Sequence, residues 1–172
     1  MLSNEAISLR PILKEDLTVL NQWKNDEETY MFLGGGYRPT SVDEQAKWMD
    51  DMISHEGANR RFMICQKEDD KPVGIIGLYG INWIHRTTEL GIFIGDKNVF
   101  GKGYGYLSCI LLEEYAKDYL NLRKLKIHVV TDNDYAFKLY RRLGFSLIGE
   151  YEKDRFIKGS YRNVTLMEKF LE

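Results

Sequence analysis

Hydrophobic residues recur along the chain with two different spacings, one typical of helices and one typical of strands. Leu17, Leu20 and Trp23 are spaced as on one face of a helix, whereas the apolar runs at 72–83 and 87–95 resemble the two arms of a β-hairpin. The pattern predicts, in chain order, a strand at 6–12, helices at 14–25 and 41–54, strands at 61–67, 72–83 and 87–95, a helix ending near 120, a strand at 124–131, a helix at 133–143, and strands at 145–157 and 161–170.

Residue types that start and end elements support these boundaries. The run Ser41-Val42-Asp43-Glu44 predicts a capping box at the start of the second helix. Gly144 is expected in the left-handed conformation that ends a helix, and turns are expected at His85-Arg86 and at Lys158-Gly159-Ser160. Early antiparallel hairpins and a central strand–helix–strand crossover predict an α/β fold on a mixed sheet.

Composition narrows the number of domains and the class of partner. We expect one domain over residues 1–172, because the chain has no repeat, no low-complexity tract and no linker. A net charge of -2 gives no argument for binding nucleic acid or an anionic membrane. The sequence shows no signal peptide and no apolar run of about 18 residues, so the cytoplasm is the expected compartment.

Cysteines and histidines give no sign of a metal site or of a disulfide framework. Cys65 and Cys109 are far apart and lack metal-like spacing. His55, His85 and His128 are scattered along the chain, and His128, which alternates along a predicted strand, is interpreted as a packed ring. We therefore expect no metal.

A glycine-rich segment, Phe100-Gly101-Lys102-Gly103-Tyr104-Gly105-Tyr106, separates a predicted strand from a predicted helix. Glycines let the backbone turn tightly and approach a ligand, and a helix N-terminus offers free N–H groups and positive charge. The segment therefore predicts a site for an anion such as a pyrophosphate, although its residues alone fit a turn without a ligand equally well. An RNA-binding strand is disfavoured, because Cys109 replaces the final aromatic residue of the RNP1 pattern and a helix follows.

A second group of residues lies in the run Thr131-Asp132-Asn133-Asp134-Tyr135-Ala136-Phe137-Lys138-Leu139-Tyr140. Asn133 and Tyr140 are seven residues apart, so they share one helix face with a rise of roughly 10 Å between them. This spacing suits an extended ligand that contacts an amide at one end and a phenol at the other.

Together the two motifs resemble the cofactor half of the GNAT superfamily of acetyltransferases. The family's loop pattern, Gln/Arg-x-x-Gly-x-Gly/Ala, places its glycines at Gly103 and Gly105, and Phe100 stands where Gln or Arg is usual. The match covers about residues 72–170 and implies a GNAT-like fold, a central and mostly antiparallel sheet flanked by helices. The family's second pattern, Asn…Tyr…Gly-Phe, is matched by Asn133, Tyr140, Gly144 and Phe145.

The resemblance implies acetyl-CoA as the co-substrate. The pantetheine arm would pair like an added strand with the main chain after residue 92, with Asn133 on its other side, and the pyrophosphate would lie on the amides of the glycine-rich loop. The cofactor-binding residues expected from the resemblance are Phe93, Ile94, Gly95, Phe100, Gly101, Lys102, Gly103, Tyr104, Gly105, Tyr106, Asn133 and Ala136.

Direct attack of an amine on a thioester needs one proton acceptor and one proton donor. An alkyl amine is almost fully protonated at neutral pH, so a base is required. The resemblance implies that Glu89 is the base, although Glu89 fits a surface carboxylate equally well. It implies that Tyr140 is the general acid, and this interpretation is favoured over a tyrosine that only packs at a helix face. Cys109 as an acyl carrier is a less favoured alternative.

The acceptor is expected to be bound by residues 26–56 and by the last hairpin. Acidic residues in the first region predict either a rim that attracts cations or, in the favoured interpretation, a solvated helix face. They are Asp26, Glu27, Glu28, Asp43, Glu44, Asp50 and Asp51.

A further resemblance bears on the identity of the acceptor. Residues 81–89 resemble the same segment of bacterial spermidine N-acetyltransferases and of enzymes that acetylate ribosomal-protein N-termini. However, Gly34-Gly35-Gly36 stands where the polyamine enzymes carry paired glutamates. We expect a polyamine or other small amine as acceptor, with a protein N-terminus or an amino sugar as alternatives. A non-catalytic, CoA-binding regulatory domain is a further alternative, and relatives are often homo-oligomers.

Overall fold

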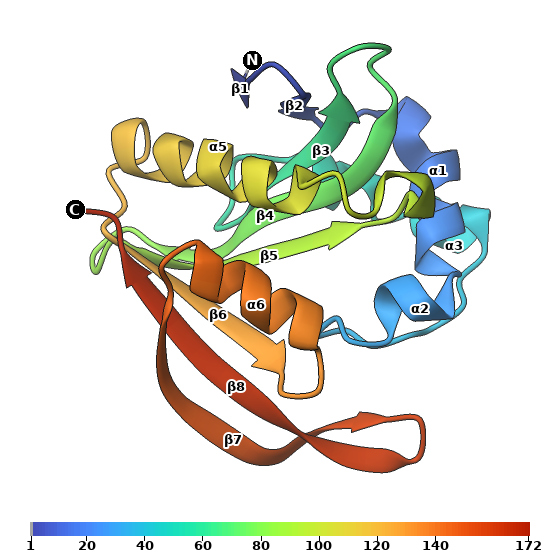
Figure 1. Cartoon of the computed structure of the whole chain (residues 1–172). Coiled ribbons are helices and arrows are strands. Elements are labelled where there is room, and N and C mark those ends of the chain that lie inside the picture. The colour runs from blue at the N-terminus through green and yellow to red at the C-terminus, as the bar shows by residue number, and fades with distance from the viewer. Residues whose placement is uncertain (1) are drawn as a thin grey trace.

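The strands of the computed structural model form one mixed sheet, and the structure describes residues 2–172 (Figure 1). The spatial order is β1-β2-β3-β4-β5-β6-β8-β7. Neighbouring strands are antiparallel except for β5 and β6, which are parallel, and this confirms the predicted mostly antiparallel sheet. The strands are β1 (Leu2–Ser3), β2 (Ile7–Pro11), β3 (Arg60–Gln66), β4 (Pro72–Asn82), β5 (Thr87–Ile94), β6 (Lys124–Val130), β7 (Ser146–Ile157) and β8 (Ser160–Phe170).

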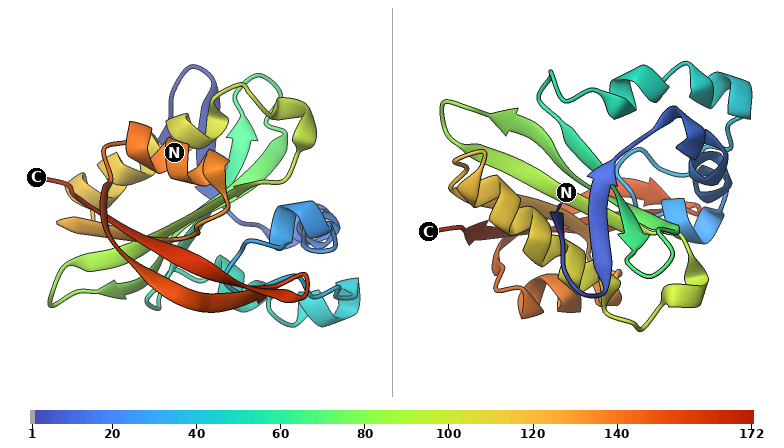
Figure 2. Two further views of the ribbon diagram at one scale, coloured as in Figure 1. Left: turned by 60° about the horizontal axis from the view of Figure 1, so that its bottom comes forward. Right: turned by 90° about the horizontal axis from the view of Figure 1, so that it is seen from above.

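Helices cover both faces of this sheet (Figure 2). Phe62 and Ile64 of β3 share a core with α5 and α6, whereas Met63 and Cys65 pack with α1 and α4 on the opposite face. Because successive strand residues point to opposite faces, one strand supplies both cores. The helices are α1 (Leu17–Lys24), α2 (Glu27–Tyr30), α3 (Val42–Ala46), α4 (Met49–Ile53), α5 (Tyr104–Asp118) and α6 (Asp134–Arg142), with 3₁₀ turns η1 (Lys14–Asp16) and η2 (Lys97–Val99).

The prediction of one helix over 41–54 is wrong, because two short helices occupy this range. The N–H groups of Lys47 and Trp48 bond to carbonyls three residues back, and this tighter turn interrupts the helix. Of the predicted capping box, the structure contains the bond from the Glu44 N–H to the Ser41 hydroxyl, at 3.1 Å. The sequence also gave no sign of the four-residue helix α2, which is too short to show a periodic pattern.

Helix α6 ends as the sequence predicts. Gly144 has φ +91°, the left-handed conformation that an L side chain adopts only with strain. The Gly144 N–H bonds to the Arg141 carbonyl and the Phe145 N–H to the Tyr140 carbonyl, each at 3.0 Å. These two bonds form a Schellman motif, so the residue that ends the helix also holds the main chain of Tyr140.

Strands β5 and β6 are paired over only three residues each, Thr87–Glu89 with Lys124–Lys126. Beyond Glu89 the two strands diverge, β5 staying with β4 and β6 staying with β8. Residues 90–94 of β5 therefore have a neighbouring strand on one side only. A strand edge of this kind presents main-chain N–H and C=O groups that a ligand can bind.

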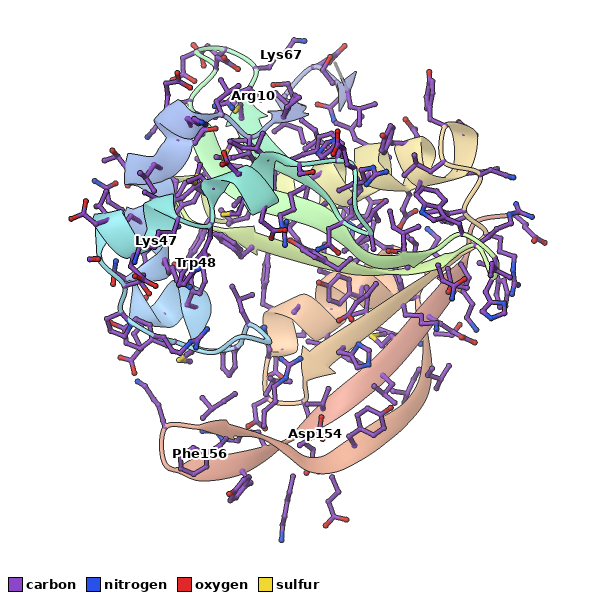
Figure 3. The ribbon with its side chains drawn as sticks, turned by 180° about the vertical axis from the view of Figure 1, so that it is seen from behind. Arg10, Lys47, Trp48, Lys67, Asp154 and Phe156 are labelled. Atoms are coloured by element: carbon purple, nitrogen blue, oxygen red, sulfur yellow. The ribbon has the colours of Figure 1, made fainter. Side chains whose placement is uncertain are left out.

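An ion pair next to the start of the helical segment contributes to stability. Arg10, which projects from β2 (Figure 3), donates from both of its terminal nitrogens to the Asp16 carboxylate at 2.8 and 2.9 Å, and the side chains are only 13% and 6% exposed. Burial alone would raise the pKa of Asp16. Hydrogen bonds from Arg10 and from the Leu13 amide outweigh that effect and hold this pKa below its ordinary value.

We predict that Asp16→Asn lowers the free energy of unfolding by about 3 kcal/mol, because it leaves the Arg10 charge without a partner. Asp16 contributes stability above the ordinary aspartate pKa of about 3.9, and that stability is lost as the pH falls through the lower folded-state pKa. Urea unfolding between pH 7 and pH 3 measures both effects. The wild type should lose more stability than the variant over this range, and equal losses would contradict the prediction. Asp118→Asn, at the exposed end of α5, is the matched control and should change little.

Candidate active site

A cleft of about 580 Å³ opens where β5 leaves β6. Its walls are the last residues of β5, the glycine-rich loop with the first turn of α5, one face of α6, and α2 with the residues that follow it. Ten of the residues predicted to bind cofactor or to catalyse line this cleft, namely Phe93, Ile94, Phe100, Gly101, Gly103, Tyr104, Gly105, Asn133, Ala136 and Tyr140.

The glycine-rich loop ends directly at the N-terminus of α5. Gly101 and Gly103 have φ values of +83° and +79°, and Gly103 is the residue that caps the helix. Gly105 is buried beneath the cleft, where a side chain would contact Tyr135 and Leu139. The first N–H groups of a helix have no partner within it, so this wall of the cleft provides donors for an anion.

Two loop residues from the predicted set lie outside the cleft. Lys102 is exposed, and its N–H bonds to the Val99 carbonyl at 3.2 Å. The ring of Tyr106 lies under the Arg142 guanidinium, 4.1 Å from it. Neither residue is among those that line the cleft.

Of the three residues expected to pair with the pantetheine arm, residues 93–95, Ile94 alone presents its main chain to the gap. The Gly95 N–H donates to the Val73 carbonyl at 2.8 Å, and the Phe93 carbonyl lies so close to Gly74 that an added Cβ there would overlap it. Both groups therefore face β4. Since alternate residues point to opposite edges, the main chains of Ile92 and Ile94 face the gap.

Phe93 and Gly95 are instead fixed by packing. The Phe93 ring lies against Trp23 and Tyr30, with ring centres 6.0 and 5.2 Å apart. A side chain at Gly95 would overlap the indole of Trp23. Sequence reasoning missed Ile92, and the signal that would have found it is the two-residue period of the strand.

Asn133 and Tyr140 lie on the same side of α6, as their spacing predicts, and both line the cleft. The Asn133 side-chain oxygen accepts a hydrogen bond from the Ala136 N–H at 3.3 Å and so caps the helix. Its NH₂ group keeps two donors for a ligand. Asn133 therefore combines a structural bond with free donor capacity.

The Tyr140 phenol is 6% exposed and packs edge-on against Phe145, with ring centres 5.7 Å apart. Burial raises the pKa of Tyr140 well above its ordinary value, and the nearby Cys109 and Glu89 add to the shift. A phenol in this state keeps its proton at neutral pH, which leaves it able to donate a hydrogen bond or a proton.

Glu89 is the last residue of β5 that pairs with β6. Leu90 and Ile92 point into the core beneath α5, so Glu89 points to the opposite face, together with Phe93. Its Oε1 atom is 3.0 Å from Nδ1 of His128 on β6. The sequence interpretation of His128 as a packed ring gave no sign of this contact.

The two cysteines are unreactive. Cys65 and Cys109 are both 0% exposed, and burial raises the pKa of the Cys65 thiol to about 11 and that of Cys109 further still. A buried thiol that holds its proton is a poor acyl carrier. Among residues 2–172, no group of three or more His, Cys, Asp or Glu side chains is arranged to hold a metal ion. None of the helices in this part of the chain has the length and apolar character needed to cross a membrane.

The acidic residues of the 26–51 region are largely paired with cations. Lys97 lies 3.2 Å from Asp26 and 2.9 Å from Glu28, and Lys158 on the last hairpin lies 3.2 Å from Glu27. The remaining pairs are Lys47 with Glu44, Lys14 with Asp50 and Arg61 with Asp51. Of the seven acidic residues, Asp43 alone has no ion pair within residues 2–172, so the region does not act as an unopposed negative rim.

A second hollow of about 470 Å³ lies between the 27–37 segment and the end of the β7–β8 hairpin. Asp154 and Phe156 belong to this end of the hairpin (Figure 3), and Arg155 donates to the Phe32 carbonyl at 2.9 Å. The three glycines at 34–36 line the other side. The two regions expected to bind the acceptor are therefore adjacent in the fold.

Comparison with known proteins identifies the family. The model of the acetyltransferase (GNAT) domain matches residues 7–146. The spermidine N(1)-acetyltransferase of Escherichia coli K12 is 34% identical over 170 residues, which is 97% of this chain and 87% of that protein. The corresponding enzyme of Vibrio cholerae is 28% identical over 166 residues, 95% and 92% of the two chains.

A solved structure extends the likeness to three dimensions. The crystal structure of Vibrio cholerae spermidine N-acetyltransferase with CoA and spermine superimposes with a TM-score of 0.86 at 30% identity, over 98% of this chain and 97% of that one. The GNAT fold expected from the two motifs is therefore confirmed. The chain belongs to the GNAT family and is an acetyl-CoA-dependent N-acetyltransferase.

Proposed function

We propose that this enzyme acetylates a primary amine of a polyamine, with Glu89 as the base and Tyr140 as the general acid. The observation that carries the proposal is the position of these residues at the divergence of β5 and β6. Glu89 is the last paired residue of β5, and Tyr140 lines the cleft that opens beyond it. An amine and a thioester brought together there would meet both groups.

Acetyl-CoA would bind along the cleft with its two ends held differently. The free main-chain edge at Ile92 and Ile94 suits the amide groups of the pantetheine arm, and the NH₂ of Asn133 suits their carbonyls. The amides around Gly103, at the start of α5, suit the pyrophosphate. This assignment keeps Ile94, Asn133 and the glycines of the predicted set and replaces the main chains of Phe93 and Gly95 with that of Ile92.

The reaction needs two proton transfers. The acceptor arrives as an ammonium ion and gives one proton to the Glu89 carboxylate, which leaves a nucleophilic amine. The amine nitrogen forms a bond to the thioester carbonyl carbon, and the C–S bond breaks as the tetrahedral adduct collapses. The sulfur leaves as a thiolate and takes a proton from the Tyr140 phenol. The attacking nitrogen then gives its second proton to the Tyr140 phenolate, which restores the phenol.

Two observations bear on the acceptor. The Escherichia coli and Vibrio cholerae relatives are spermidine acetyltransferases, and they support a polyamine. The ion pairs of the 26–51 region weaken the long-range attraction of a polycation, because the two charges of Lys97 and Lys158 offset two of the three carboxylates that they contact. Exposed pairs of this kind are weak, so a polyamine can displace the lysines and take their place.

Release of free thiol with a panel of acceptors tests the substrate class. We expect spermidine and spermine to give a higher kcat/KM than peptides with a free N-terminus or amino sugars. A preference for peptides or amino sugars would contradict the proposed polyamine acceptor but would agree with an acetyltransferase activity. Binding of acetyl-CoA without thiol release from any acceptor would favour the regulatory alternative.

We predict that Tyr140→Phe lowers kcat by about a hundredfold or more while the Kd for CoA stays within twofold of the wild type, because only the proton donor is lost. Steady-state kinetics and calorimetry with CoA measure the two quantities. Tyr119→Phe, at a tyrosine that is 77% exposed beyond α5, is the control and should behave as the wild type. A Tyr140→Phe variant with full turnover would exclude Tyr140 as the acid.

We predict that Gly103→Ala weakens CoA binding about tenfold, or about 1.4 kcal/mol, because a side chain at φ +79° displaces the amides at the start of α5. Gly159→Ala is a matched control, since Gly159 has φ +81°, open space around it and a position in the β7–β8 turn. Both variants should lose similar thermal stability, but only Gly103→Ala should change the Kd measured by calorimetry. Equal Kd values would argue against the loop as the diphosphate site.

A further inference from the structure

Three side chains from three strands form a row on the sheet face that carries Glu89. His128 of β6 lies between Glu89 of β5 and Tyr151 of β7. Its Nδ1 atom is 3.0 Å from Glu89 Oε1, and its ring stacks on that of Tyr151 with centres 6.2 Å apart and an interplanar angle of 24°. The row therefore extends from the catalytic centre toward the edge of the sheet.

The strand registers bring these residues together. Glu89 is opposite Lys126 in the short parallel pair, and His128 is two residues further along β6 on the same face. On its other side β6 pairs with β8, and in this pair His128 is opposite Leu166. His128 is thus the first side chain on this face of β6 after the strands have separated, and no other strand residue stands between it and Glu89.

Packing explains the histidine only in part. Its ring stacks on Tyr151, but 32% of its side chain is exposed. Its Nδ1 atom has no hydrogen-bond partner within residues 2–172, since the approach to Glu89 is not aligned for such a bond. Catalytic hydrogen bonds are often poorly aligned before substrate binds. The stacking accounts for the position of the ring, but it does not account for an Nδ1 atom that lies 3.0 Å from Glu89 Oε1 without a hydrogen bond.

We infer that His128 is the proton relay of the base, an inference that rests on the role of Glu89 proposed above. Glu89 takes a proton from the substrate ammonium and becomes a neutral acid. That proton passes from the Glu89 carboxyl to Nδ1 of the neutral imidazole, which restores the carboxylate and forms an imidazolium. The imidazolium releases its Nε2 proton to water, because Nδ1 is buried, and exchange of the proton left on Nδ1 between turnovers returns the ring to its starting tautomer. One proton thus leaves the amine and reaches solvent, and Glu89 is ready for the next acceptor.

The position of Glu89 explains why a relay is useful. Its side chain is 44% exposed when the cleft is open, but an acceptor amine poised over the thioester covers the carboxyl from the cleft side. Neither Glu89 nor His128 is among the residues that line the cleft, and 32% of the His128 side chain is exposed. The ring of His128 therefore offers the proton a route to water beside Glu89.

Replacement of His128 tests the relay in the full-length chain with acetyl-CoA and spermidine. We predict that His128→Ala lowers kcat about tenfold to a hundredfold, with the KM for each substrate changed less than threefold. Added imidazole should restore turnover in a concentration-dependent manner, because a free imidazole can accept the Glu89 proton. His85→Ala, at the exposed hairpin turn, is the control and should neither lose activity nor respond to imidazole.

Two further variants separate proton transfer from positioning. His128→Gln keeps size and polarity without a titratable ring, so it should be as slow as His128→Ala if the proton matters. In a Glu89→Gln background, His128→Ala should cost no further activity, since the two residues act in one path.

The outcomes distinguish this inference from the proposed function. An active wild type whose His128→Ala variant keeps full kcat, or loses activity that imidazole does not restore, would overturn the relay alone. A His128→Gln variant with wild-type turnover would also overturn it. A wild type that releases no thiol with any amine would overturn the proposed function and the relay with it.

Discussion

Strands β5 and β6 run side by side over Thr87–Glu89 and Lys124–Lys126 and then separate, and the chemistry of this protein depends on that separation. It leaves the main chain of Ile92 and Ile94 without a partner and opens the cleft. It also places Glu89 on one side of the opening and brings Tyr140 of α6 to the other. A fully paired sheet would bury these backbone groups and leave no room for an extended ligand.

The elements around the cleft are held by bonds that serve structure and function at once. Gly103 allows the loop to enter α5 with its amides free, and Asn133 caps α6 with its oxygen while its NH₂ remains available. The Schellman motif at Gly144 holds the carbonyl of Tyr140, and the core holds its ring. Because these side chains are positioned before any ligand arrives, little ordering remains to be done on binding.

Charge on the acceptor side is balanced rather than uniform. Carboxylates of the 26–51 region are paired with lysines and an arginine, two of them, Lys97 and Lys158, from distant segments. A polyamine bound as proposed would exchange with these ion pairs between the 27–37 segment and the β7–β8 hairpin. The same hairpin supplies Tyr151, which stacks on His128 beside Glu89, so one element contributes to the second hollow and to the surroundings of Glu89.

The sequence predicted most of the strands and the long helices in their observed order, the mostly antiparallel sheet, the glycine-rich entry to α5 and the shared helix face of Asn133 and Tyr140. Each of these features follows from a local pattern in the sequence, such as a glycine where φ must be positive, the helical period, or a turn between two apolar runs. The break in the 41–54 helix and the free edge at Ile92 rather than Phe93 are local features that the sequence interpretation missed. The pairing of the acidic residues and the contact of Glu89 with His128 became visible only in the folded chain. These features depend on strand register and on partners up to 131 residues apart, such as Glu27 and Lys158, and no local pattern encodes such distances.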